Sequence, residues 1–254
     1  MTPEPAPLPP PMDVSEVGPP RMGEGARLAG VFFSPSAAFA DIARWPRWWV
    51  PVIISALLAT VYLNAFTRRV GWESTIRQAM EQSPQIQQMP SQQREQTIRA
   101  AAGIYKYVGY VGGLFGVLSV FIVAVALLLL FDVMMGAQIG LKRYMAIVAY
   151  GFLPSIVSTI LALVVLFLKN PEDFDLQNPL MFNLGAFLSS DASAWLKRLG
   201  SSLDLFSLWI IVLLAIGIAA ASPKKMSFGK ALAGVMIPWM LYVAVVTGLA
   251  GLRG

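Results

Sequence analysis

The chain has 254 residues, of which 56% are hydrophobic and 13% charged, and its formal net charge is +5. It contains no cysteine and no histidine, which excludes disulfides, thiolate nucleophiles, imidazole ligands and the serine–histidine and cysteine–histidine catalytic arrangements. The basic residues form no stripe interleaved with aromatic residues, so nucleic acid is not an expected partner.

Five uncharged apolar stretches decide the fold class. About 20 helical residues cross a hydrocarbon core roughly 30 Å thick. A soluble domain of this size does not need five consecutive helices that are apolar on every face. The sequence therefore predicts an all-α integral membrane bundle of five transmembrane helices, with spans at about 48–66, 107–131, 144–168, 205–221 and 231–252.

Two regions are expected along the chain. Eight prolines fall within residues 1–22, so residues 1–23 are predicted to be a disordered proline-rich tail. Residues 24–254 are predicted to form the membrane domain, which opens with a short interfacial amphipathic helix. Ser34 and Pro35 are typical of a helix start, and Phe39 and Ile42 then share one face with Ala43.

An aromatic and basic collar follows this helix and suits the depth of the lipid headgroups. Its members are Arg44, Trp45, Arg47, Trp48 and Trp49. The alternative is that this segment only caps the first span.

The connections between spans differ in length and charge. The glutamine-rich loop after the first span predicts two polar, solvent-exposed helices at Glu73–Gln82 and Ser91–Lys106, the second running directly into the second span. Another helix is expected at Ala192–Leu199. The short connections Met134–Arg143 and Ser222–Lys230 together carry five basic residues.

These charges predict the orientation. Raw counts place 9 basic residues on one side and 10 on the other, but the positive-inside rule weighs short loops near span ends. We therefore expect a cell-membrane protein with a cytoplasmic N-terminus and an extracytoplasmic C-terminus. Arg68 and Arg69, directly after the first span, argue for the opposite orientation.

Several residues within or beside the spans are candidate functional or structural positions. Gly109 and Gly113 have the four-residue spacing that lets membrane helices pack closely, either inside the molecule or in a homodimer. Pro154 and Pro238 should each kink a span, with hydroxyls that follow Pro154 bonding the freed carbonyls, and a kink can also frame a substrate path.

Two acids lie at the ends of spans. Asp132 is expected to form an interfacial ion pair with Lys142 and Arg143, the alternative being a functional site. Asp204 is placed to cap the fourth span, with binding of a partner through the acidic loop as the alternative. Trp209 is expected to pack near the outer headgroups.

Short segments near three spans form an ordered set. They are Phe33-Ser34-Pro35, Phe39, Ile42 and Pro46; Lys142-Arg143, Ala146, Val148, Tyr150 and Pro154; and Asn178-Pro179, Asn183-Leu184-Gly185, Leu203-Asp204-Leu205-Phe206, Trp209 and Gly217. Together with the five spans, this set resembles the prokaryotic branch of the Yip1 family over roughly residues 26–250. Eukaryotic members of that family associate with Rab-type GTPases. The resemblance to the prokaryotic branch implies no established activity, so that partner is not carried over. The proline tail and the glutamine-rich loop also depart from the eukaryotic pattern.

The absence of a nucleophile–base pair and the Yip1 resemblance together predict a non-enzymatic scaffold or adaptor, which binds other membrane proteins or organises lipid. The lipid bilayer, other membrane proteins or a second copy of the chain are the expected partners, and no metal or cofactor is expected. A small transporter or channel subunit is the alternative, and an enzyme ranks third.

Overall fold

A computed structural model describes residues 21–81, 84–176, 178–189 and 192–252. The predicted proline-rich tail lies outside these residues except for its last three, 21–23. Across the described part of the chain the regular structure is helical, and an isolated bridge between Asn183 and Asp204 is the one β-type pairing found there.

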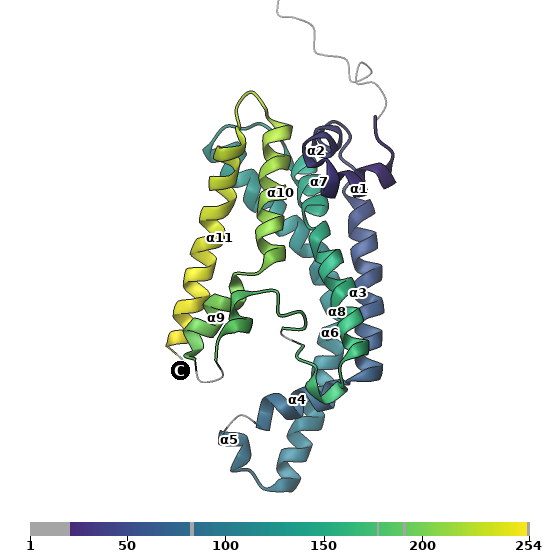
Figure 1. The fold of residues 1–254 in the computed structure, drawn as a ribbon, viewed down its shortest axis with the longest axis vertical. Coiled ribbons are helices and arrows are strands. Elements are labelled where there is room, and N and C mark those ends of the chain that lie inside the picture. Colours follow the sequence, from purple (N-terminus) through teal and green to yellow (C-terminus); the bar gives the residue numbers. More distant parts are fainter. Residues whose placement is uncertain (1–20, 82–83, 177, 190–191, 253–254) are drawn as a thin grey trace, which may run out of the picture.

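Five helical segments form the predicted bundle (Figure 1). The first span is α3 (Trp49–Arg69), and the second combines the end of α6 (Ser91–Leu127) with the π-helix η2 (Leu128–Met134). The third is divided into α7 (Leu141–Gly151) and α8 (Leu153–Leu168), and the fourth and fifth are α10 (Leu205–Ala221) and α11 (Phe228–Gly251).

By length and composition, four of these segments can cross a membrane, and α10 is apolar but shorter, at 17 residues. A helix of that length rises about 25 Å, which is at the lower limit for a span. The all-α membrane bundle predicted from the sequence is therefore confirmed.

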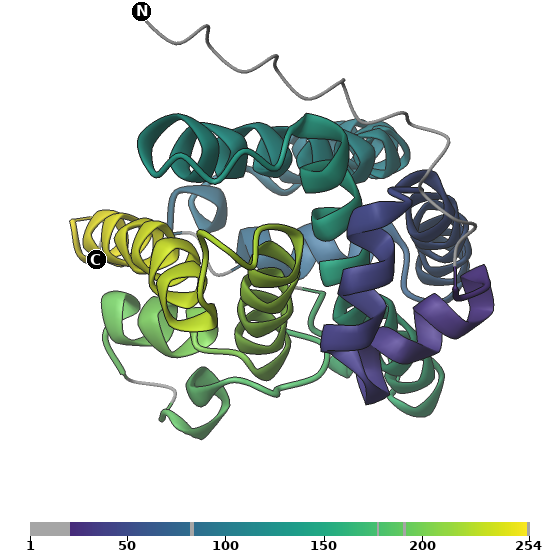
Figure 2. The ribbon, with the colours of Figure 1, turned by 90° about the horizontal axis from the view of Figure 1, so that it is seen from above.

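One end of the bundle carries an N-terminal hairpin made of α1 (Glu24–Phe33) and α2 (Pro35–Arg44). Figure 2 looks onto this end, with the hairpin over one side and α11 on the other. The two short connections meet here, because Ser222 Oγ donates to Ala137 O at 2.8 Å and Lys225 Nζ donates to Gly136 O at 2.9 Å. We call this the hairpin end, comprising residues 21–48, 132–143 and 222–230.

The hairpin is part of the protein core. The predicted apolar face of α2 is present, with Phe39 and Ile42 fully buried, but it packs against α7 and α10. Gly217 on α10 permits this close approach, since a Cβ there would lie 2.7 Å from Ile147 and 3.0 Å from Phe39. Ser34 stands at the N-cap position of α2 but makes no side-chain capping bond.

The opposite end, called the loop end, comprises the described residues within 68–106 and 169–204. It holds α4 (Trp72–Glu81), α5 (Pro84–Gln87), η3 (Pro171–Asp173), η4 (Leu184–Phe187) and α9 (Ala194–Ser202) (Figure 1). The helices expected in the glutamine-rich loop are found, and the second continues into the span as predicted. They are not polar all round, however, because α4 and α6 bury Ile76, Ile98 and Ala102 between them.

Large apolar side chains remain exposed along the outer faces of the spans. Leu57 on α3, Val164 on α8 and Leu241 on α11 are 63%, 49% and 63% exposed. Lipid tails are as apolar as these side chains, so a membrane accepts such faces without further burial. The largest buried cluster instead gathers α1, α2, α7, α10 and η2.

Arg69 has a structural reason to lie at the loop end. Its Nε donates to Leu166 O at 2.7 Å and its Nη2 donates to Phe167 O at 2.8 Å, so it satisfies the last carbonyls of α8. Its position is therefore explained without the positive-inside rule.

The two ends also differ in charge. Among the described residues the hairpin end has nine basic and three acidic residues, whereas the loop end has nine basic and seven acidic residues. Short basic loops gathered at one end are typical of a cytoplasmic side, and the orientation stays a prediction.

The two prolines inside spans have different outcomes. At Pro154 the helix is divided: α7 ends at Gly151, and α8 begins at Leu153 with Pro154 in its first turn. Around Pro238 helix α11 is continuous from Phe228 to Gly251. The hydroxyl of Thr159 bonds Ser155 O within α8, so it does not bond a carbonyl freed by Pro154.

Candidate functional site

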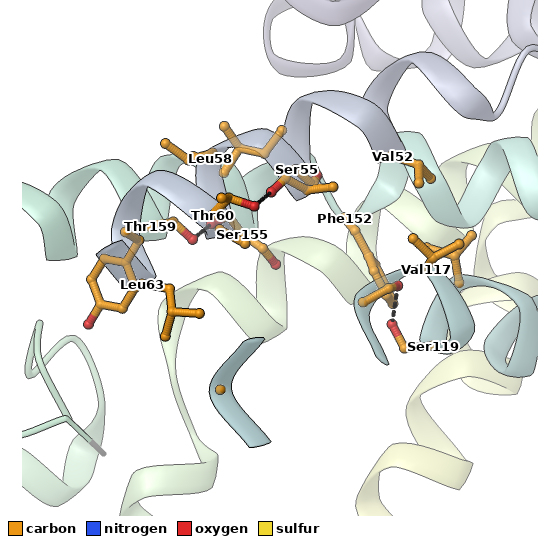
Figure 3. Close-up of a pocket in the computed structure, with 17 residues that line it drawn as sticks. Val52, Ser55, Leu58, Thr60, Leu63, Val117, Ser119, Phe152, Ser155 and Thr159 are labelled. Atoms are coloured by element: carbon orange, nitrogen blue, oxygen red, sulfur yellow. Dashed lines mark hydrogen bonds between the residues drawn. The ribbon is translucent and has the colours of Figure 1, made fainter. Parts of the chain in front are cut away.

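A crevice of about 550 Å³ lies between α3, α6 and α8 near the middle of the spans (Figure 3). Small residues form much of its wall: Ala56, Ala59, Gly109 and Gly116. Ser55, Ala59 and Ser155 are exposed, so the crevice is open to the outside of the bundle.

Hydroxyl groups from all three helices line the crevice (Figure 3). Thr60 donates to Ala56 O, Thr159 to Ser155 O and Ser119 to Gly116 O, each at 2.8 Å. These bonds use the hydroxyl hydrogens within single helices and leave acceptor lone pairs for a ligand or another helix. The residues found to line the crevice are all uncharged.

Gly109 and Pro154, both predicted from the sequence, shape this region. A Cβ at Gly109 would lie 2.7 Å from the Trp72 ring and 3.1 Å from Leu63, so this glycine serves packing within the molecule. The break beside Pro154 is followed by Ser155, which lines the crevice. The surroundings of Gly113 lie outside the described side chains.

Asp132 has different partners from those expected. Its Oδ1 accepts from Ile139 N at 2.9 Å and from the Tyr144 hydroxyl at 2.8 Å, and its Oδ2 accepts from Gly140 N at 2.8 Å. These bonds close the turn that follows η2. The ion pair predicted with Lys142 and Arg143 is not formed, since Arg143 donates to Ala43 O at 3.0 Å.

Asp204 has the capping geometry expected of it. Its Oδ1 accepts from Phe206 N at 2.9 Å and from Ser207 N at 3.0 Å, at the start of α10. This satisfies two of the amides that a helix N-terminus leaves without intrahelical partners.

Trp209 has a packing partner that the sequence did not predict. Its ring meets Phe32 of α1 edge-on, with centroids 5.4 Å apart, and it packs against the main core. It therefore joins α10 to the hairpin. The sequence could not show this, because Phe32 and Trp209 are far apart in the chain.

Two of the family-like segments lie side by side at the loop end. Asn183 pairs with Asp204 in the isolated bridge, and Leu205 N donates to Phe182 O at 3.1 Å. A Cβ on Gly200 would lie 2.7 Å from Gly185 N, so these glycines allow α9 to approach η4. The segments around residues 183–185 and 203–206 thus form one structural junction.

The sequence interpretation missed an ion cluster built around the buried Arg27 and Asp41. It is called here the hairpin ion cluster and comprises Glu24, Arg27, Asp41, Arg47 and Tyr150. Arg27 Nε donates to Asp41 Oδ2 at 2.9 Å, and Nη1 donates to Trp45 O at 3.0 Å. The Tyr150 hydroxyl donates to Glu24 Oε2 at 2.5 Å, which joins α7 to the hairpin. The three-residue spacing of Glu24 and Arg27 was the local signal available for part of it.

Within the described residues, no group of three or more acidic side chains lies close enough together to hold a metal ion.

Comparison with known proteins places the chain in a family. The Yip1 domain matches residues 29–250, which is most of the sequence. The membrane protein YknW of Bacillus subtilis (strain 168) is 26% identical over 234 residues, covering 90% of this chain and 94% of that protein. No solved structure matches. The chain is therefore a membrane protein that belongs to the Yip1 domain family.

Proposed function

We propose that this Yip1-domain protein is a non-enzymatic membrane adaptor, and that the crevice between α3, α6 and α8 receives a transmembrane helix of a partner protein. The observation that carries the proposal is an open crevice in the middle of the spans, walled by small and hydroxyl residues. In lipid, small residues let helix backbones approach, and serine and threonine hydroxyls bond across the contact.

The spacing of the wall residues supports a helix as the occupant. On α3, Ser55 and Ala59 are separated by three residues, and so are Ala56 and Thr60; Ser155 and Thr159 repeat the spacing on α8. Small residues at this spacing lie on one helix face. In addition, α3 buries only Pro51 and Phe66 among its 21 residues, so much of its surface is available to another protein.

The acids that adjoin the spans support a non-enzymatic role. Asp132 and Asp204 both accept hydrogen bonds from backbone amides, and these bonds close a turn and cap a helix. Such contacts stabilise local structure and leave neither carboxylate positioned as a general base toward the crevice.

Crosslinking from the crevice tests the proposal. The chain has no cysteine, so Ala59→Cys creates a unique attachment point for a photoactivatable crosslinker. The matched control is Leu57→Cys, on the same helix but 63% exposed and outside the crevice. In native membranes we expect a discrete protein adduct from Ala59→Cys that is absent from Leu57→Cys.

A second substitution shows whether the adduct depends on the crevice. A Cβ at Gly116 would meet nothing within 4 Å, so Gly116→Leu should extend into the crevice and abolish the adduct without lowering the amount of folded protein. Gly103→Leu, also on α6 with nothing within 4 Å but outside the crevice, should leave the adduct intact. Equal adducts from both cysteines, or an adduct that survives Gly116→Leu, would contradict the proposal. An adduct of twice the chain mass would identify a second copy as the occupant.

The hydroxyl lining favours transport as a second candidate, since acceptor groups near mid-membrane suit a polar solute. The two functions differ in water access. A charged, membrane-impermeant thiol reagent should label Ser119→Cys if the crevice is a water-filled path. The charged reagent should fail to label Ser119→Cys if a helix or lipid occupies the crevice. As a control, a small apolar thiol reagent should label the denatured protein equally in both cases.

A further inference from the structure

A second cavity, at the hairpin end, combines positive charge with an apolar wall. It has a volume of about 640 Å³ and lies between α2, the last turns of α10 and the first residue of α11. Arg44 and Arg143 are its charged lining residues, and no described acid lines it. We call it the basic groove.

The two arginines are held differently. Arg143 is fixed, because its Nε donates to Ala43 O at 3.0 Å and its Nη1 to Ile139 O at 3.3 Å, which leaves Nη2 outside these bonds. Arg44 is exposed and forms no ion pair with a described residue. The basic groove therefore offers one positioned and one adaptable guanidinium group.

The acids at the same end do not neutralise these charges. Asp41 is engaged by Arg27, whose Nη2 lies 2.8 Å from its Oδ2, and by the backbone amide of Arg21, which donates to its Oδ1 at 2.9 Å. Asp132 is engaged by Tyr144 and by the backbone amides of the turn after η2. The positive charge of the basic groove is thus available to an anion from outside the chain.

The walls indicate which kind of anion fits. Ala40 and Ala43 on α2 face Ala219 and Ala220 on α10, with Ile216 deeper along the span. Small side chains leave an apolar channel that runs from the arginines along the helices. A free phosphate would meet only the arginines, whereas a lipid would also place a hydrocarbon chain against the alanines.

We propose that the basic groove binds a phospholipid with an anionic headgroup, whose phosphate contacts Arg44 and Arg143 and one of whose acyl chains lies along the alanine wall. Guanidinium groups suit phosphate because they offer several hydrogen-bond donors in one plane. The surplus of basic residues at the hairpin end agrees with this site, since cytoplasmic leaflets carry the anionic lipids.

Lipid retention by the purified full-length protein tests the site. The protein is incubated in detergent with equal amounts of phosphatidylglycerol and phosphatidylcholine, and bound lipids are counted by native mass spectrometry. We expect selective retention of phosphatidylglycerol. Arg44→Gln should lower it about fivefold, because the headgroup phosphate loses one of its two guanidinium contacts. The side chain of Arg44 is exposed and forms no ion pair with a described residue, so the fold should be unaffected.

Two further variants separate this site from diffuse attraction. Lys224→Gln removes the same charge from an exposed residue of the same end outside the basic groove, and should leave retention unchanged. Ala219→Leu fills the channel and should lower retention with both arginines intact. Equal loss in Lys224→Gln, unchanged retention in Arg44→Gln, or displacement of the lipid by millimolar inorganic phosphate alone would overturn the proposal.

Discussion

The guanidinium of Arg27 is fully buried and faces the carboxylate of Asp41, with its Nε 2.9 Å and its Nη2 2.8 Å from the same oxygen. The Nε contact is a hydrogen bond, whereas the Nη2 contact is an ion pair without hydrogen-bond geometry. This pair joins α1 to α2. Through Glu24 and Tyr150 the same hairpin ion cluster is tied to the third span.

Loss of Arg27 alone should weaken the fold strongly. Arg27→Met leaves Asp41 buried without its cation, which we expect to cost about 3–5 kcal/mol. The double variant Arg27→Met with Asp41→Leu removes both charges and should recover much of this loss. Thermal unfolding in detergent measures both. Arg47→Met is the control, because Arg47 is 48% exposed and its ion pair with Glu24 should contribute under about 1 kcal/mol. A double variant no more stable than the single one would refute this account.

Asp132→Asn should destabilise the turn after η2. An asparagine has one acceptor oxygen, and its other terminal group only donates. In place of Asp132 it would turn its amide hydrogens toward either Ile139 N or Gly140 N, and that backbone amide would lose its acceptor. We expect a loss of about 1.5–3 kcal/mol, as for hydrogen bonds to charged groups. Tyr144→Phe removes one of the three bonds and should cost less. Lys142→Gln should be neutral, and a loss there as large as for Asp132→Asn would instead support the ion pair.

Asp204→Ala should lower thermal stability by about 0.5–2 kcal/mol, because two amides of α10 lose their acceptor. Asp204→Ser and Asp204→Asn should restore most of it, since both side chains can cap a helix. If the alanine variant unfolds like the wild type, capping is not the role of Asp204.

The orientation can be read with fused reporters. A reporter that is active only outside the cytoplasm should be active after Arg253 and silent when inserted at Lys225. Lys225 belongs to the hairpin end, whereas α11 reaches the opposite end of the bundle at Gly251, beside Trp195. The reverse pattern would show that the hairpin end is extracytoplasmic.

The contact between α4 and α6 should depend on pH. Arg77 Nη1 donates to Glu95 Oε1 at 2.7 Å, and this bond lowers the pKa of Glu95 below its usual value. A lowered pKa means that the contribution is present above the pKa of the unfolded chain and is lost as pH falls through the lowered pKa. The protection of the α4 amides, measured as their exchange rate relative to the intrinsic rate at the same pH, should therefore fall on acidification. Glu95→Gln should give fast exchange at neutral pH too, and an unchanged profile would exclude this pair as the cause.

The spans could be predicted from the sequence because an uncharged apolar run long enough to cross the membrane is itself the signal of a span. The capping role of Asp204 was also predictable from the sequence, because a cap contacts backbone amides only two and three residues further along the chain. The hairpin ion cluster was not, because Glu24 and Tyr150 are 126 residues apart and only the tertiary fold brings them together. Arg27 resembles an interfacial arginine in the sequence, and nothing local shows that it is buried.

The crevice was equally beyond sequence reasoning. Ser55, Ser119 and Ser155 are ordinary small residues within their own spans, and their common surface exists only once three helices pack. The expectation for Asp132 failed in a related way. Local charge suggested Lys142 and Arg143 as partners, whereas the carboxylate accepts from the backbone amides of Ile139 and Gly140 in the turn.

The interruption at Phe152 bears on how the molecule can deform. α7 is buried and held to α10, where a Cβ at Gly151 would lie 2.7 Å from Leu214, whereas α8 packs with the lipid-facing α3. Pro154 has no backbone N–H to donate to the preceding turn, so α7 and α8 can change their relative orientation more easily than two parts of an unbroken helix. We therefore expect a partner helix bound in the crevice to tilt α3 and α8 about Phe152, while the hairpin end keeps its position.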